Sequence, residues 1–227
     1  VFRTKMDAEL TRKLYQAAQV LVNKATGENP WGLSFLRMFD MTNDSNLFCA
    51  REELEKEGFE LEGNCFKKSR EVRLPLYEGK MFMPYDHRFA HVVITQNLSR
   101  PGQPDFANEE EHTEASFVAM PRFWVDSRYI DKQVDQNYPF KWLLGFKNVT
   151  SPTNERTFLN TIIPRSGVGN SIPIILSKSQ TNASFISLLN ANLSSFVFDF
   201  LARQKIGNVN LNFFIVEQLP VIVPIRY

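Results

Sequence analysis

The chain has 227 residues, which is enough for one large domain or two small ones, each with a buried core. Its 43% hydrophobic and 22% charged residues are those of an ordinary globular protein, and no apolar run reaches the roughly 20 residues that a membrane helix needs. Two cysteines, Cys49 and Cys65, are too few for a disulfide framework and lie outside any Cys-x-x-Cys pair. We therefore expect neither a structural zinc nor a membrane, and reduced thiols in a cytoplasm.

The formal net charge is only +1, whereas domains that bind nucleic acid are usually more basic. The charge is unevenly spread along the chain. Residues 1–149 carry 20 Lys/Arg and 22 Asp/Glu, and the residues from 150 onward carry six Lys/Arg and three Asp/Glu. A locally positive surface on a neutral protein is therefore possible. Because the chain starts with neither a secretory signal nor an initiator methionine, we expect a piece of a longer polypeptide.

The N-terminal segment has helical periodicity. Apolar residues recur at helical spacing, and Thr4 with Asp7 forms a capping-box-like start, which predicts an amphipathic helix over residues 5–23. A strand is expected at residues 31–39. A second helix is expected from residue 44 or 45 to about residue 57, where a glycine ends it.

The middle of the chain is β-rich. Apolar runs and alternation predict strands at residues 72–76, 91–95, 116–120, 142–146 and 156–164. The proline- and glycine-containing residues 99–104 are typical of a loop, and the acidic residues 109–111 indicate a solvated surface insertion.

The longest helix is expected late in the chain. A broad apolar face, with Thr181 as its cap and Gly207 after its end, predicts a helix over residues 181–205. An apolar segment, residues 212–223, follows it. The mixture predicts an α+β protein, with a helical connector subregion at residues 1–62 and a larger α+β domain at residues 63–227.

Six blocks of the sequence, in order, resemble one protein family. They are Phe2-Arg3 with Asp7–Thr11, Asn29–Trp31 with Met38–Ser45, Leu76–Met81 with Tyr85–Arg88, Asn154–Thr157, Asp199–Lys205, and Leu211–Phe214 with Gln218–Val221. This ordered set resembles the segment that follows the catalytic domain in type IIG restriction–modification enzymes and in the adenine-specific DNA methyltransferases of phage-defence systems. The sequence departs from the family pattern at Phe146-Lys147-Asn148, where relatives tend to carry an Arg-Asp pair.

The resemblance implies a target-recognition domain with a mixed, curved β-sheet and a long C-terminal helix, similar to the recognition domains of type I specificity subunits. It implies that an amino-terminal methyltransferase domain of the same polypeptide binds S-adenosylmethionine, with magnesium as a possible second cofactor of the parent. The fragment itself lacks the glycine-rich turn and the Pro-Pro-aromatic loop of such a catalytic domain, so we expect no catalytic residue, metal or cofactor in it.

A dense polar cluster, Asp86-His87-Arg88 with His91, follows Tyr85. Two histidines four residues apart can chelate a metal on a helix, but the flanking apolar residues predict a strand, on which the rings are too far apart for easy chelation. A structural polar network and direct contact with DNA remain the two interpretations.

Glu78-Gly79-Lys80 has the acid-x-Lys form of many magnesium-dependent nucleases. That reaction would need another carboxylate on a neighbouring strand, and the upstream glutamates are not distinctive. The simpler interpretation is a turn that places Lys80 at a DNA phosphate. A magnesium nuclease using Glu78 and Lys80 is the alternative, and a scaffold docking the methyltransferase domain through the 181–205 helix is another.

The basic residues of the C-terminal half each have either a structural role or a role in contacting DNA. Arg203 and Lys205 either offset the dipole at the end of their helix or clamp a phosphate. Arg156 is either paired with a carboxylate or turned to DNA, and Arg165 and Asn170 flank a glycine loop that suits contact with base edges.

The function expected from the sequence is sequence-specific recognition of double-stranded DNA, without membrane association. The residues expected to contact DNA are Lys80, Tyr85, His87, Arg88, Arg156, Arg165, Asn170, Arg203, Lys205 and Asn210.

Overall fold

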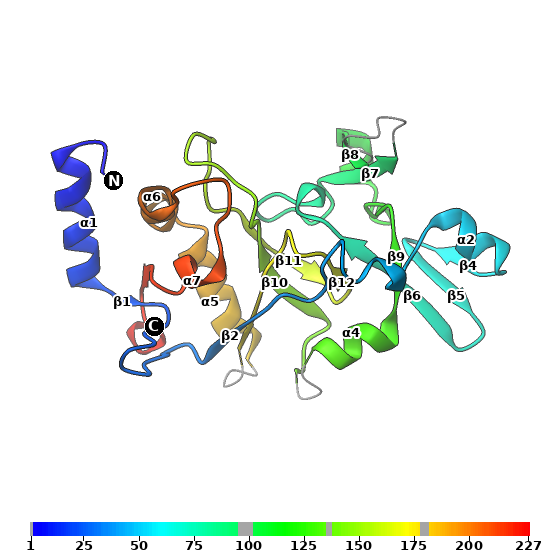
Figure 1. The fold of residues 1–227 in the computed structure, drawn as a ribbon, viewed down its shortest axis with the longest axis horizontal. Helices are drawn as coiled ribbons and strands as arrows, with labels where there is room; N and C mark the ends of the chain where they lie inside the picture. The colour runs from blue at the N-terminus through cyan, green and yellow to red at the C-terminus, as the bar shows by residue number, and fades with distance from the viewer. Residues whose placement is uncertain (1, 95–101, 135–137, 178–181) are drawn as a thin grey trace. The chain divides into compact units, whose positions relative to one another are not determined.

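A computed structural model describes residues 2–94, 102–134, 138–177 and 182–227 (Figure 1). Helix and strand occur in nearly equal shares, 31% and 29%, and the sheets are mainly antiparallel. The α+β class predicted from the sequence is therefore confirmed. The chain forms two compact units, which comprise residues 1–36, 144–160 and 173–227 (unit 1) and residues 37–143 and 161–172 (unit 2).

Unit 1 holds both ends of the chain. Its elements are α1 (Lys5–Ala17), β1 (Gln19–Val20), β2 (Leu33–Leu36), β13 (Ile174–Ser177), α5 (Ala183–Leu193), α6 (Phe196–Lys205), α7 (Phe213–Val216), β14 (Pro220–Val221) and the short turn η3 (Pro224–Arg226). The boundary between the units falls within β10 (Trp142–Phe146) and β11 (Asn160–Pro164). These two strands belong to a four-stranded sheet of order β11-β10-β13-β2.

Three buried phenylalanines form part of the core of unit 1. The rings of Phe146 and Phe158 stack at 5.3 Å between centroids, and Phe198 of α6 meets Phe158 edge-on at 4.7 Å. All three side chains are at most 2% exposed. This packing of helix against sheet follows from the apolar face of residues 183–205, which must be buried to stabilise the helices.

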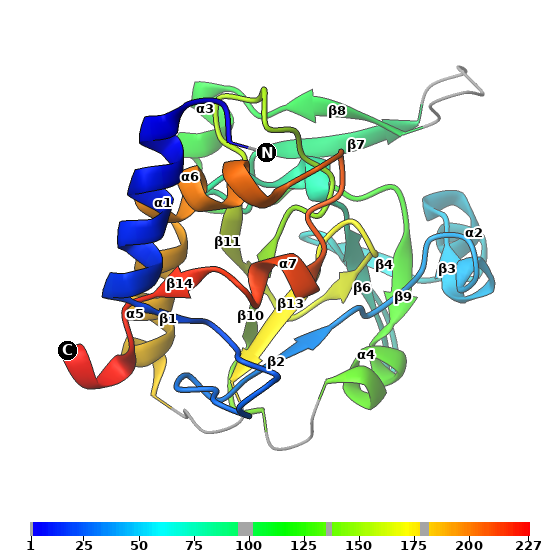
Figure 2. The same cartoon turned by 60° about the vertical axis from the view of Figure 1, so that its left-hand side comes forward.

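Unit 2 is built on one larger sheet. Its elements are η1 (Ser45–Leu47), β3 (Phe48–Cys49), α2 (Arg51–Lys56), β4 (Glu60–Glu62), β5 (Cys65–Lys68), β6 (Glu71–Tyr77), η2 (Gly79–Met81), β7 (Ala90–Ile94), β8 (Gly102–Phe106), α3 (Glu109–Thr113), β9 (Trp124–Asp126), α4 (Ser127–Gln133) and β12 (Gly167–Val168). The sheet has the order β3-β9-β6-β5-β4, and β12 pairs with β6 in parallel. Strands β7 and β8 form a separate antiparallel ribbon, visible with α3 in Figure 2.

Several expected elements differ from the observed ones. The helix expected over residues 5–23 ends at Ala17, because Ala18 is extended and β1 pairs with β14. The helix expected over residues 44–57 is interrupted by β3, which pairs with β9. Sequence periodicity missed both interruptions because they are caused by pairing with distant strands.

Other corrections concern the strands. Residues 116–120 form no strand, and the strand expected over residues 156–164 begins only at Asn160. The strand expected at 91–95 is observed as β7, although Thr95 lies outside the described residues. Gly102 to Pro104 belong to β8 rather than to a loop, and Pro104 is tolerated because the ribbon has only two strands.

The helix expected over residues 181–205 is two helices. Ser195 is the N-cap of α6, its hydroxyl accepts a hydrogen bond from the backbone N–H of Phe198, and α5 and α6 are bent by 59° at this break. Asn182 caps α5, and the expected cap Thr181 lies outside the described residues. Within the described ranges no single helix is long and apolar enough to span a membrane. The bent pair α5–α6 passes this test together, by length and composition only.

Candidate nucleic-acid interface

The segment after β6 carries an exposed aromatic ring on a strained turn. Met83 and Asp86 exchange two backbone hydrogen bonds of 2.8 and 3.0 Å across Pro84 and Tyr85. Pro84 in the second position and φ of +65° at Tyr85 in the third are typical of a type II turn, where glycine is usual. Tyr85 is nevertheless 72% exposed. A bulky residue held in the left-handed region with its ring in solvent is a candidate contact residue.

The base of this turn is held by an internal ion-pair network. The guanidinium of Arg122 donates to both oxygens of Glu78, at 2.7 and 3.4 Å, and Lys80 Nζ lies 3.3 Å from the same carboxylate. Lys80 also donates to the carbonyl of Gly102 at 2.7 Å, which ties η2 to the start of β8. Glu78 is 6% exposed, so this carboxylate requires these cations inside the protein.

Arg88 is bound to a neighbouring loop of the same unit. Its guanidinium donates to the carbonyls of His112, Glu114 and Phe117 at 3.2–3.3 Å and lies over the Phe117 ring, 5.6 Å from its centroid. These contacts make Arg88 a support for the segment after α3. The acidic stretch that begins at Glu109, expected as a solvated insertion, forms the short helix α3 at this place.

The histidines of this region are held separately. His112 bridges the carbonyl of Asn108 at 2.9 Å and the carboxylate of Asp86 at 3.1 Å. His91 accepts a hydrogen bond from the backbone N–H of Met120, and its other ring nitrogen lies 3.4 Å from Glu111. The two rings therefore have partners of their own beneath the turn that presents Tyr85.

His87 lies next to the exposed turn. Its side chain is half-buried, and this burial, with the nearby Arg88 cation, lowers the pKa of the imidazole below its usual value. A neutral His87 can offer one donor and one acceptor to a polar ligand.

The ribbon beside this turn is apolar at its surface. Val93, Ile94 and Phe106 are 39%, 62% and 62% exposed, and Phe106 packs on Phe89 with 5.2 Å between ring centroids. A two-stranded ribbon has the width that the DNA major groove accepts. The ribbon and the Tyr85 turn belong to one unit, and the Lys80–Gly102 hydrogen bond links η2, which precedes the turn in the chain, to the start of β8.

The glycine loop after β11 joins the same region. Gly79 donates its backbone N–H to Ser171 Oγ at 3.0 Å, and β12 lies beside the end of β6. Asn170 donates to the carboxylate of Asp40 at 3.2 Å, and Arg165 pairs with Asp131 at 2.9 Å. The structure thus brings the 165–171 loop to the 78–88 segment within unit 2.

Arg156 and Arg203 meet at one buried carboxylate in unit 1. Asp199 of α6 is 5% exposed and lies 3.1 Å from Arg203 Nη2 and 3.6 Å from Arg156 Nε. Arg203 also donates to the carbonyls of residues 152, 154 and 155. Two of the blocks that carry the family resemblance, residues 154–157 and 199–205, are therefore joined by this cluster.

Lys205 and Asn210 lie elsewhere in unit 1. Lys205 is exposed, with its ammonium 5.6 Å above the ring of Tyr15, and Asn210 is half-buried in a bridge to Val149. The residues expected at DNA thus form separate groups in the two units.

Sequence reasoning missed two features. Asp199 is an acidic residue inside an apolar helix, and a buried carboxylate there needs cations such as the arginine four residues later, which was an available signal. The exposed cations Arg12 and Lys13 of α1 were also passed over, and neither has a polar partner among the residues that the structure describes. Unit 1 carries 11 Lys/Arg and 6 Asp/Glu, a formal charge of +5 that is hidden in the total of +1.

The magnesium-nuclease arrangement lacks support in the observed contacts. Both oxygens of Glu78 face Arg122, and the ranges that the structure describes contain no group of three or more His, Cys, Asp or Glu side chains that could hold a metal ion. Cys49 and Cys65 are free thiols whose pKa values are raised, mainly by burial.

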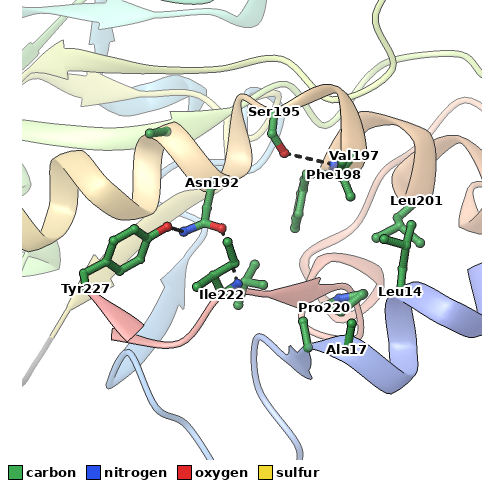
Figure 3. A pocket seen from close by; sticks show the side chains of 13 residues that line it. Leu14, Ala17, Asn192, Ser195, Val197, Phe198, Leu201, Pro220, Ile222 and Tyr227 are labelled. Carbon is green, nitrogen blue, oxygen red and sulfur yellow. Dashed lines mark hydrogen bonds between the residues drawn. The ribbon is translucent and has the colours of Figure 1, made fainter. Parts of the chain in front are cut away.

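An apolar cavity of about 430 Å³ lies in unit 1 (Figure 3). It opens between α1, the junction of α5 and α6, and β14. None of the residues expected to contact DNA lines it. This cavity and the Tyr85 turn are therefore distinct candidate sites.

Searches for relatives add no assignment. No protein-family model matches the chain, and no curated protein sequence matches it.

Proposed function

We propose that this chain recognises double-stranded DNA in a sequence-dependent manner, as the target-recognition part of a cytoplasmic adenine-specific methyltransferase or restriction–modification enzyme. The observation that carries the proposal is Tyr85, a solvent-exposed aromatic ring on a left-handed turn beside an apolar two-stranded ribbon. Rings and apolar wedges in such positions insert between base steps or pack on thymine methyl groups. The methyltransferase domain of the same polypeptide would bind S-adenosylmethionine and act on the selected adenine.

The two units would divide the work. In unit 2, Tyr85 and His87 would contact bases, while Lys80, Arg88, Arg165 and Asn170 hold the turn and the neighbouring loop in place through the contacts described above. In unit 1, the surplus of positive charge would attract the duplex, with Lys205 and Asn210 as contacts and the unpaired Arg12 added to them. Arg156 and Arg203 would act indirectly, by fixing the 150–157 loop.

The proposal is tested by fluorescence titration of a labelled mixed-sequence duplex at rising salt. We expect binding that weakens with salt, with a logarithmic slope of about −0.9 for each phosphate neutralised. Repeated selection from a pool of randomised duplexes should then enrich one sequence motif. The absence of binding at low salt would contradict DNA recognition, and salt-dependent binding without enrichment would contradict its sequence dependence.

A matched pair of variants locates the contact. Tyr85→Phe keeps the ring and should retain the selected motif, whereas Tyr85→Ala should reduce affinity for the selected duplex by about tenfold, since a stacked aromatic ring contributes roughly 1–3 kcal/mol. Arg12→Gln should lower affinity for all duplexes alike and flatten the salt slope. Equal affinities for Tyr85→Ala and the unchanged protein would remove Tyr85 from the interface.

A further inference from the structure

Helix α1 leaves two large apolar side chains, Met6 and Leu10, at the surface of unit 1. Met6, Leu10 and Leu14 follow one another at helical spacing and form the stripe that makes the helix amphipathic. Met6 is 76% exposed and Leu10 43% exposed, whereas the most buried residue of α1 is the polar Thr11, at 8%. Thr11 Oγ1 has no hydrogen-bond partner among the described residues. Leu14 is half-buried, so α1 packs through a face of mixed polarity and leaves only the Met6 and Leu10 part of its stripe exposed.

The stripe continues into the apolar cavity. Leu14 and Ala17 of α1 form one wall of it, and Val197 and Leu201 of α6 form the opposite wall, as Figure 3 shows. Ile222, directly after β14, also lines the cavity and is 48% exposed. Leu14 belongs both to the stripe and to the cavity lining, and we call the stripe and the cavity together the α1 groove.

Polar groups at the α1 groove are already occupied. Asn192 donates to the hydroxyl of Tyr227 at 2.7 Å, and Ser195 Oγ accepts from the backbone of Phe198 at 3.1 Å. With these groups engaged, the groove is suited to apolar side chains rather than to a polar small molecule. An uncovered apolar surface that continues from a helix into a groove is typical of a protein interface.

The charges beside the stripe are self-complementary, so that opposite charges would meet if two copies packed together. Glu9 and Lys13 lie on the same flank of the stripe, one turn apart. If two α1 helices pack antiparallel with Leu10 of each facing Leu14 of the other, Glu9 of one copy lies opposite Lys13 of its partner, and the reverse pair forms by symmetry. Glu9 is held within its own helix only by Lys5, in an exposed pair at 3.8 Å, which competes weakly.

We propose that the α1 groove is the interface between two copies of this chain, closed by antiparallel packing of the two α1 stripes. The second copy would cover the exposed apolar side chains of the α1 groove. The stripe of each copy would pack against the stripe of the other. The proposal does not depend on DNA recognition.

The test is sedimentation equilibrium of the purified chain over a wide range of concentration. We expect a reversible dimer, with twice the 26.3 kDa chain mass. Leu10→Glu should yield a monomer with an unchanged circular dichroism spectrum, since this exposed position is not needed for folding. A monomer at every concentration, or a dimer that Leu10→Glu leaves intact, would overturn the proposal.

Charge exchange tests the antiparallel arrangement. Lys13→Glu should weaken dimerisation by about tenfold or more, because it places like charges opposite each other. The double variant Glu9→Lys with Lys13→Glu should restore it. Arg12→Glu is the matched control, since it makes the same charge change on the opposite side of α1 and should leave the dimer unaffected. Failure of the double variant to restore the dimer would overturn the antiparallel pairing.

Discussion

Asp199 and Arg203, one turn apart on α6, form an ion pair of 3.1 Å that also anchors a distant loop. Asp199 Oδ1 accepts hydrogen bonds from the backbone N–H groups of Thr157 and Phe158, both at 2.7 Å. Arg203 binds carbonyls of that same loop. The pair thus joins α6 to residues 152–158, and this contact is the physical reason why an acidic residue stands in an apolar helix.

Removal of the Asp199 carboxylate should destabilise the protein strongly. Asp199→Ala leaves Arg203 and two buried backbone donors without their acceptor, and we expect the free energy of unfolding to fall by about 3–5 kcal/mol. Urea unfolding measures the loss. Glu155→Ala, in the exposed part of the same loop, is the control and should change stability by less than about 0.5 kcal/mol. A loss below about 1 kcal/mol for Asp199→Ala would contradict the anchoring role.

A variant of Arg203 distinguishes a structural role of this residue from contact with a DNA phosphate. Arg203→Gln should lower the free energy of unfolding by about 2 kcal/mol, because several hydrogen bonds to charged or buried partners are lost. The salt dependence of duplex binding, measured below the unfolding range, should stay unchanged. A salt slope reduced by about one unit with normal stability would instead assign Arg203 to a phosphate.

At Tyr85 we expect glycine to give a more stable protein than alanine, which is the reverse of the usual order. At an ordinary position, replacing alanine by glycine destabilises the folded state. At φ of +65° glycine is free of the steric penalty that a Cβ incurs, so Tyr85→Gly should be more stable than Tyr85→Ala by about 1 kcal/mol. Both variants lack the ring and should bind DNA equally poorly. Thermal unfolding checks the first statement, and equal or reversed stabilities would contradict the observed turn conformation.

Lys147 predicts a dependence of stability on pH. Burial lowers the pKa of its ammonium group to about 8, from a usual value of 10.5. Between these values the unfolded chain holds a proton that the folded chain has released, so the free energy of unfolding should rise with pH. A group that is protonated only in the unfolded chain raises the free energy of unfolding by about 1.4 kcal/mol per pH unit. Because Lys147 is partly accessible to solvent, we expect a rise of about 1 kcal/mol per pH unit.

The matched variant for Lys147 is Lys147→Met. Urea unfolding of both proteins at intervals between about pH 7.5 and pH 10, a window chosen around these pKa values, isolates the contribution of this residue as the difference between the two curves. The difference should increase with pH in favour of the unchanged protein. Parallel curves would show that the ammonium group titrates alike in the folded and unfolded chains.

Glu78 and Lys80 predict no magnesium-dependent cleavage. Arg122 occupies both oxygens of Glu78, so a metal ion would have to displace an arginine. We expect supercoiled plasmid incubated with the chain and magnesium to remain intact, for the unchanged protein and for Lys80→Ala alike. Nicking that requires magnesium and disappears in Lys80→Ala would support a nuclease instead.

The sequence by itself determined the α+β class and the elements whose signals are local. The box of Thr4 and Asp7 starts α1 as predicted, with both reciprocal hydrogen bonds formed, because its partners are three residues apart. The alternation of apolar residues likewise located β6 and β10, and both strands carry buried apolar side chains.

Only the tertiary structure decided which polar residues meet. Asp199 binds backbone groups some 41 and 42 residues away, and Gly79 binds Ser171 across 92 residues, so no local pattern could reveal either contact. The break before α6 arises where Ser195 caps a new helix, in a run that periodicity alone extends without interruption. Arg156 and Arg203 lie at the carboxylate of Asp199, because a charge that is removed from water must be compensated inside the protein. Tyr85, in contrast, remains exposed to solvent.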